Sequence, residues 1–152
     1  MNLDPGEAGF RSLIKRIEEE GITQQIQIFL SVLLPKSLVS RSINLLYKST
    51  SIKCHVARRS RRTYWTMTSN HHQYFILSDE NLKFCSCLSY QNNVVKNGEY
   101  RFCKHILAII ISQALLKKGN FSQILIMELE DEQFAEMIAS SSLSMNYKMK
   151  KT

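Results

Sequence analysis

The chain has 152 residues, of which 44% are hydrophobic and 22% charged, and these values are ordinary for one globular domain with its own core. Its formal net charge of +7 is compatible with a nucleic-acid partner and equally with an acidic protein partner. Because the N-terminus shows no secretory pattern and the apolar runs are too short to span a bilayer, we expect no membrane segment, a cytosolic or nuclear location, and reduced thiols.

Apolar residues recur at helical spacing between about residues 8 and 50 and predict a helical N-terminal segment. Gly21 is placed to end a first helix and Pro35 a second. Ser37 is a candidate cap for a third helix. We expect the apolar side of each helix to pack into the core.

Residues 51 to 87 read as short strands separated by turns. Ile52, Cys54 and Val56 alternate with polar or small residues, and the later runs "TYWTMTS" and "QYFIL" are rich in residues that favour strands. The turn signals "RRSRR" and "SDEN" separate these runs. This pattern predicts a small antiparallel meander of three or four strands.

A long apolar helix is predicted to begin after Cys103 and to end near Gly119, with lysines in its last turn. A short helix is expected from about residue 130 to 139, followed by a flexible tail at 141–152. The sequence therefore predicts an α+β fold in which residues 1–50 form the helical segment. Residues 51–140 form the meander, the cysteine-rich segment and the C-terminal helices, in one compact unit with 1–50.

Three of the four cysteines and one histidine stand in two tight pairs, with fifteen residues between the pairs. The pairs are Cys85 with Cys87, and Cys103 with His105. Three thiolates and one imidazole make a closed tetrahedral set for zinc, with Zn–S near about 2.3 Å and Zn–N near about 2.0 Å. Since no coordination position stays open, we predict one structural Zn²⁺ rather than a catalytic one.

The spacing within each pair also fits one metal ion. Residues two apart on a strand point to the same side, so Cys85 and Cys87 can converge. Positions two apart inside a helix diverge by roughly 200°, so Cys103 must precede the helix while His105 lies in its first turn. Buried free thiols beside a satisfied histidine remain the alternative interpretation.

The remaining cysteine and nearby histidines give no second set of ligands. Cys54 lies on the apolar side of a predicted strand, and we interpret it as a core residue. His71 and His72 are expected in a hairpin loop, where either could only replace one of the four ligands.

At "CSC…FCKHILAIIISQ" the sequence resembles the SWIM zinc finger, whose pattern is C-x-C, a variable gap, then C-x-H. Beyond this motif, about residues 20 to 140 resemble the SWIM-domain subunits of Shu complexes in their strands, their "CKH" helix and the acidic segment "LEDEQFAEMI". On this resemblance Cys85, Cys87, Cys103 and His105 are the zinc ligands. The N-terminal helices are not specific to that family.

The resemblance implies a nuclear subunit that pairs with a RecA-like recombinase paralogue, as a heterodimer. The pair would help the recombinase assemble on single-stranded DNA in homologous recombination and the repair of DNA damage. A SWIM finger from another setting, transposase-derived or associated with a ubiquitin ligase, is the alternative. An enzyme is not expected, because the sequence has no G-x-x-x-x-G-K-[ST] loop and no evident nucleophile with its base.

Two further sets of residues are candidates for binding. The predicted long helix is apolar nearly all round, so we expect a partner chain to cover part of it, with Ile106, Ile109, Ile110 and Leu115 as interface candidates. Four arginines beside Tyr64 and Trp65 suit phosphate and unpaired bases: Arg58, Arg59, Arg61 and Arg62. A solvated hairpin with both rings packed inward, or contact with an acidic protein surface, are the alternatives for this turn.

Overall fold

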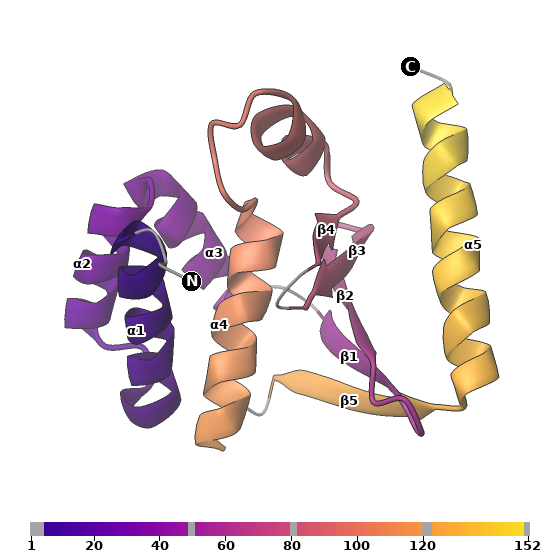
Figure 1. Ribbon diagram of the computed structural model, residues 1–152, viewed down its shortest axis with the longest axis horizontal. Helices are drawn as coiled ribbons and strands as arrows, with labels where there is room; N and C mark the ends of the chain where they lie inside the picture. Colours follow the sequence, from indigo (N-terminus) through magenta and orange to yellow (C-terminus); the bar gives the residue numbers. More distant parts are fainter. Residues whose placement is uncertain (1–4, 49–50, 80–81, 120–122, 151–152) are drawn as a thin grey trace.

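The structure is a computed structural model that describes residues 5–48, 51–79, 82–119 and 123–150, with side chains described no further than residue 141. Within these residues it is an α+β fold with six helices and a five-stranded mixed sheet, which confirms the predicted fold class. The N-terminal helices, helix α4, the sheet and helix α5 follow one another as layers (Figure 1).

The N-terminal segment forms three helices, α1 (Pro5–Glu20), α2 (Gln24–Leu33) and α3 (Lys36–Lys48). Gly21 ends α1 with a positive φ of 78°, as its position predicts. Thr23 caps α2, because its side-chain oxygen accepts a hydrogen bond of 3.1 Å from the backbone N–H of Ile26. The prediction for Ser37 was wrong, since α3 already begins at Lys36 and Ser37 lies inside its first turn.

Four strands form the predicted antiparallel meander: β1 (Ser51–Ala57), β2 (Thr63–Ser69), β3 (His72–Ser78) and β4 (Lys83–Cys85). Asn70 and His71 both have positive φ in the tight turn between β2 and β3. The turn at "SDEN" includes residues 80 and 81, which lie outside the described residues.

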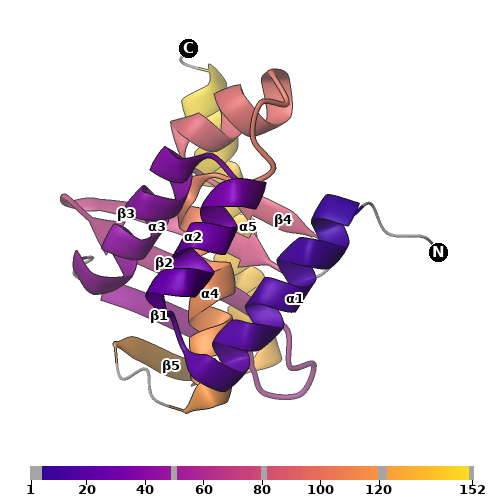
Figure 2. The ribbon, with the colours of Figure 1, turned by 90° about the vertical axis from the view of Figure 1, so that its left-hand side faces the viewer.

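A fifth strand, β5 (Ile124–Leu129), corrects the prediction of a purely antiparallel sheet. It lies beside β1 and parallel to it, with Ile124 opposite Ile52, so the strand order is β4-β3-β2-β1-β5. No strand is predicted for this segment above, although "ILIMEL" is an apolar run that could have indicated one. In Figure 2, β5 lies at the lower edge of the sheet.

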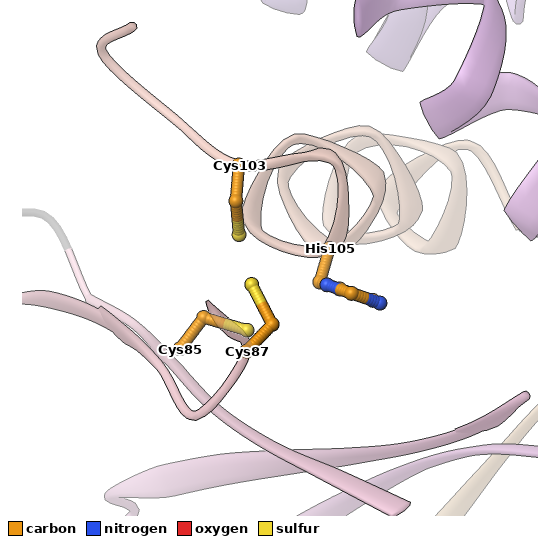
Figure 3. A group of neighbouring side chains, drawn as sticks. All are labelled: Cys85, Cys87, Cys103 and His105. Atoms are coloured by element: carbon orange, nitrogen blue, oxygen red, sulfur yellow. The ribbon is translucent and has the colours of Figure 1, made fainter. Parts of the chain in front are cut away.

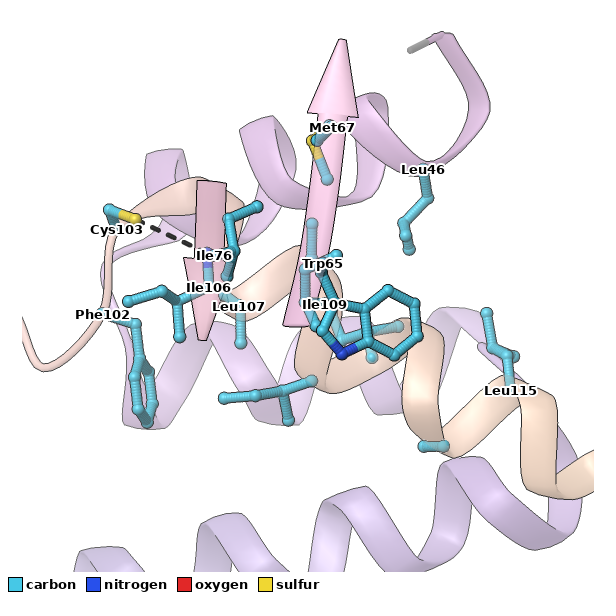
Figure 4. Close-up of a cluster of buried hydrophobic side chains, with 14 of the residues drawn as sticks. Leu46, Trp65, Met67, Ile76, Phe102, Cys103, Ile106, Leu107, Ile109 and Leu115 are labelled. Carbon is cyan, nitrogen blue, oxygen red and sulfur yellow. Dashed lines mark hydrogen bonds between the residues drawn. The ribbon is translucent and has the colours of Figure 1, made fainter. Parts of the chain in front are cut away.

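Helix α4 (Lys104–Lys118) packs against one face of the sheet, and α1 and α3 pack against α4 on its other side (Figures 1 and 2). Figure 4 shows the main core, where Trp65, Met67 and Ile76 of the sheet meet Ile106 and Ile109 of α4. Each of these side chains is at most 2% exposed. Full burial of such a side chain contributes about 1.5–3 kcal/mol.

The side chains of α4 predicted as a partner interface do not lie on the surface. Ile106 and Ile109 are fully buried, and Ile110 and Leu115 are only 9% and 8% exposed, because the sheet and the N-terminal helices of the same chain cover them. The description of α4 as a long apolar helix is also too strong, since its 15 residues include Gln113 and three lysines. None of the helices in the described part of the chain has the length and apolar character needed to cross a membrane.

Helix α5 (Asp131–Lys150) lies on the opposite face of the sheet from α4 (Figure 1). Phe134 of α5 packs with Tyr64 and Ala57 in a small second cluster of buried residues. The helix extends well beyond the short helix that the sequence predicts, and its backbone is helical to Lys150 through most of the segment expected to be a flexible tail.

Candidate metal centre

The four predicted ligands come together in the structure. Their ligand atoms, the Sγ atoms of Cys85, Cys87 and Cys103 and a ring nitrogen of His105, all lie within 4.8 Å of one another. All four side chains are buried, with exposed fractions of 0, 5, 1 and 3%. In Figure 3 the three sulfurs point toward one another from two sides, with the imidazole beside them. A buried Cys₃His group at this separation could hold one metal ion.

The first pair of predicted ligands lies at the end of the meander. Cys85 is the last residue of β4 and lies opposite Ile76 of β3. Ser86 prolongs the contact with β3, because its N–H donates to the carbonyl of Phe75 and its Oγ accepts from the Phe75 N–H, both at 3.0 Å. The chain then bends, and Cys87 turns its sulfur toward that of Cys85 (Figure 3).

The second pair lies at the start of α4, as the two-residue spacing predicts. Cys103 is the N-cap, with extended backbone angles, and the helix begins at Lys104, so His105 occupies the first turn. This confirms that Cys103 precedes the helix while His105 belongs to it.

Backbone N–H groups support two of the sulfurs. The N–H of Tyr90 donates to Cys87 Sγ at 3.3 Å, and the N–H of Ile106 donates to Cys103 Sγ at 3.5 Å. The Tyr90 hydroxyl also donates to the carbonyl of Lys83 at 2.8 Å, which fixes the segment after Cys87 to the strand before Cys85. This role of Tyr90 is not predicted above, because no local motif in the sequence indicates it.

The segment between the two pairs is not the simple polar loop that its composition suggests. Residues Tyr90–Lys96 form a π-helical turn, labelled η1. On β3, the ring of Tyr74 packs against that of His105, with 4.1 Å between the ring centroids, and this contact holds the imidazole in place. Nδ1 of His105 has no hydrogen-bond partner among the described residues, so it is a donor atom still available for a metal.

The electrostatics of the cluster favour thiolate formation at one sulfur. Hydrogen bonds with the thiols of Cys103 and Cys85 lower the pKa of Cys87. The pKa of Cys85 is raised instead, by its hydrogen bonds with Cys103 and Cys87 and by burial. By contrast, burial alone raises the pKa of Cys54 to about 11, so this thiol stays protonated. Cys54 lies in the main core, as predicted, and outside the group of four.

The arginine turn differs from the basic surface that the sequence suggests. Arg58 makes ion pairs of 2.8 Å with both Glu128 and Glu130, and Arg61 Nη1 lies 3.6 Å from Glu128. The backbone N–H groups of Arg59 and Ser60 donate to the Asp131 carboxylate at 2.9 and 3.2 Å, and these bonds, that of Arg59 first, lower its pKa.

The two aromatic side chains beside this turn point into the protein. Tyr64 is 1% exposed and Trp65 is 2% exposed, so neither ring can stack on an unpaired base in this structure. The interpretation of Tyr64 and Trp65 as packing residues is therefore confirmed. A contact of the four arginines with nucleic acid stays a prediction.

The fold and site define a class of protein: a mixed-sheet α+β domain with a buried Cys₃His group fit for a metal ion, linking the sheet to a helix. Comparison of the chain with protein-family models gives no match, and comparison with curated proteins gives none either.

Proposed function

We propose that Cys85, Cys87, Cys103 and His105 bind one Zn²⁺ as a structural ion. The observation that supports zinc is the donor set: three sulfurs and an imidazole, buried and within 4.8 Å of one another. Soft thiolates with imidazole in a four-coordinate site favour zinc over the oxygen-seeking divalent ions. The ion would fasten the end of β4 to the start of α4, which are separated along the chain by the η1 segment.

We propose further that the chain is a non-catalytic adaptor of the SWIM type. Its role, on the resemblance of "CSC" and "CKH", is to pair with a RecA-like recombinase paralogue in the nucleus. This pairing would promote assembly of the recombinase on single-stranded DNA during homologous recombination and DNA repair. A site whose four ligands close the coordination sphere supports an architectural role for the ion, because no position is left for substrate or water.

A protein partner is supported by the outer face of α2. Four large apolar side chains of this helix are exposed to solvent: Ile28 (56%), Phe29 (39%), Val32 (77%) and Leu33 (37%). They neighbour one another along the helix surface, at i, i+1, i+4 and i+5. A contiguous apolar face of this kind is typical of a surface that another protein covers.

The test combines metal analysis with co-purification. The full chain should carry about one zinc per molecule, and it should form a stable complex with a co-expressed RecA-like paralogue. Val32→Glu should weaken that complex without loss of zinc, whereas Leu125→Glu, at a residue 55% exposed on another element, should leave it intact. A zinc-free protein would overturn the metal assignment. A zinc-loaded chain that binds no such paralogue would overturn only the adaptor role.

A further inference from the structure

A cavity of about 910 Å³ lies over the sheet face opposite α4. Lys53 and His55 of β1 and Phe75 of β3 line it, and the η1 segment and α5 contribute further residues to its lining. Along β1 the side chains of Lys53 and His55 alternate with Ile52 and Cys54, which lie in the core, so the cavity is on the outer face. This volume is in the range of sites for small ligands, about 300–1,000 Å³.

The lining of this cavity is basic and has no carboxylate among the described residues. Five basic side chains contribute to it: Lys53, His55, His71, His72 and Lys96. Neither lysine makes an ion pair with a carboxylate in the part of the chain that the structure describes. The arginine turn is different, because Glu128 and Glu130 already neutralise Arg58 there.

The same lining offers groups that suit a flat aromatic ligand. Phe75 is half-buried on this outer face, and Gln73, Gln91 and Asn92 also line the cavity with side-chain amides. Amides both donate and accept hydrogen bonds, so they can pair with base edges, and every base has a face that stacks on an aromatic ring.

The lining also contains a buried histidine, one of whose ring nitrogens lacks a hydrogen-bond partner. His55 is 6% exposed, its ring stacks on Tyr64 at 4.3 Å, and its Nε2 shares a hydrogen bond of 3.1 Å with Thr66 Oγ1. Its Nδ1 has no partner among the described residues. A buried polar atom without a partner costs free energy, which a polar group of a bound ligand can recover.

We propose that this cavity binds a nucleotide unit of a single-stranded nucleic acid. The phosphate lies against Lys53 and Lys96, and the base lies against the ring of Phe75 and among the amides. An acidic peptide would use the cations but would leave the aromatic and amide groups without a specific role. The proposal does not depend on pairing with a recombinase paralogue, and it places a nucleic-acid contact away from the arginine turn.

The metal centre organises one side of this cavity. Ser86 and Leu88, which line it, flank the ligand Cys87, and Gln91 and Lys96 belong to the η1 segment between the ligand pairs. Anchoring that segment at both ends holds the wall in position. We therefore expect loss of the metal to weaken binding of the nucleic acid.

The test measures binding of a fluorescent oligothymidylate to the zinc-loaded full chain at several salt concentrations. Lys53→Gln/Lys96→Gln should weaken binding about tenfold, and should lower the salt slope by about 0.7, since one phosphate contact on a single strand contributes about 0.7. The matched control is Lys36→Gln/Lys48→Gln, which removes two exposed lysines of α3 and the same charge. Near-ultraviolet circular dichroism of Trp65 checks that each variant is folded.

Two further measurements make the proposal refutable. A photoreactive oligothymidylate should crosslink to the peptide that contains Phe75. Thymidine monophosphate should compete at high concentration, while inorganic phosphate competes more weakly. Equal loss of affinity in the control variant would show non-specific attraction and overturn the proposal. Polyglutamate of the same length that binds as tightly as the oligonucleotide would also overturn it.

Discussion

Replacing the candidate ligand Cys103 by serine tests the proposed metal centre directly. A metal bound to all four ligands joins Cys87 to Cys103 and so closes the segment 88–102, a loop of 15 intervening residues. Closing a loop of this length lowers the conformational entropy of the unfolded chain, which raises the free energy of unfolding by about 3 kcal/mol. This value is a lower bound, because structural zinc in small zinc peptides contributes about 10–16 kcal/mol.

We expect Cys103→Ser to release the metal and to lower the free energy of unfolding by at least about 3 kcal/mol. For a chain of this size that corresponds to a fall in Tm of about 6–12 °C. The assay is thermal and urea unfolding of the wild type and the variant, each with and without a chelator, beside metal analysis by mass spectrometry.

Cys54→Ala supplies the matched control, since Cys54 is another buried cysteine that lies outside the metal cluster. It should lose about 1 kcal/mol through lost packing, keep its metal, and remain as sensitive to the chelator as the wild type. If Cys103→Ser kept a full complement of metal and the Tm of the wild type, the four residues would not form a structural metal site.

Three smaller predictions concern the core and the charged groups. Ile109→Ala should lower the free energy of unfolding by about 2–5 kcal/mol in urea titrations, because Ile109 of α4 is fully buried where the helix packs on the sheet. A loss as small as that of Val32→Ala, at an exposed residue, would contradict this packing. Burial lowers the pKa of His55, so its contribution to stability is present above the unfolded pKa of about 6.5 and is lost as the pH falls through the folded pKa. The free energy of unfolding of His55→Gln should therefore fall less than that of the wild type between about pH 7 and 5. Parallel curves of unfolding free energy against pH would refute this. The pKa of Asp131 is also lowered, first by the hydrogen bond from the backbone N–H of Arg59, so its contribution to stability is present above an ordinary aspartate pKa and is lost in acid. In Asp131→Asn the free energy of unfolding should therefore fall less steeply at acid pH than in the wild type. An unchanged acid dependence would count against the contact.

The arginine turn shows why a basic run in a sequence is weak support for a nucleic-acid site. Arg58 and Arg61 are close in sequence to no acid, yet the structure places Glu128 and Glu130 beside them. These exposed ion pairs add little stability, but they reduce the charge available to an external phosphate. The cavity on the outer sheet face has the opposite character, with cations drawn from β1 and η1 and no acid in its lining.

The N-terminal helices, α4 and the first four strands could be predicted because their signals are local. The helical stripes up to residue 48 and the alternation at Ile52, Cys54 and Val56 depend only on backbone periodicity and on residues such as Gly21 that end a helix. The grouping of the four candidate ligands could also be predicted from the sequence. A spacing of two residues brings side chains together on a strand and requires a helix to begin between Cys103 and His105.

The position of β5 and the burial of α4 were decided only by the tertiary structure, because both depend on contacts between distant parts of the chain. The pairing of β5 with β1 joins residues about seventy positions apart, and no periodicity in "ILIMEL" specifies its partner or its parallel direction. Similarly, the sequence of α4 shows an apolar helix but not what covers it, and the sheet and the N-terminal helices of the same chain bury Ile106 and Ile109. Local chemistry fixes which elements form, whereas burial and charge pairing are properties of the packed assembly of those elements.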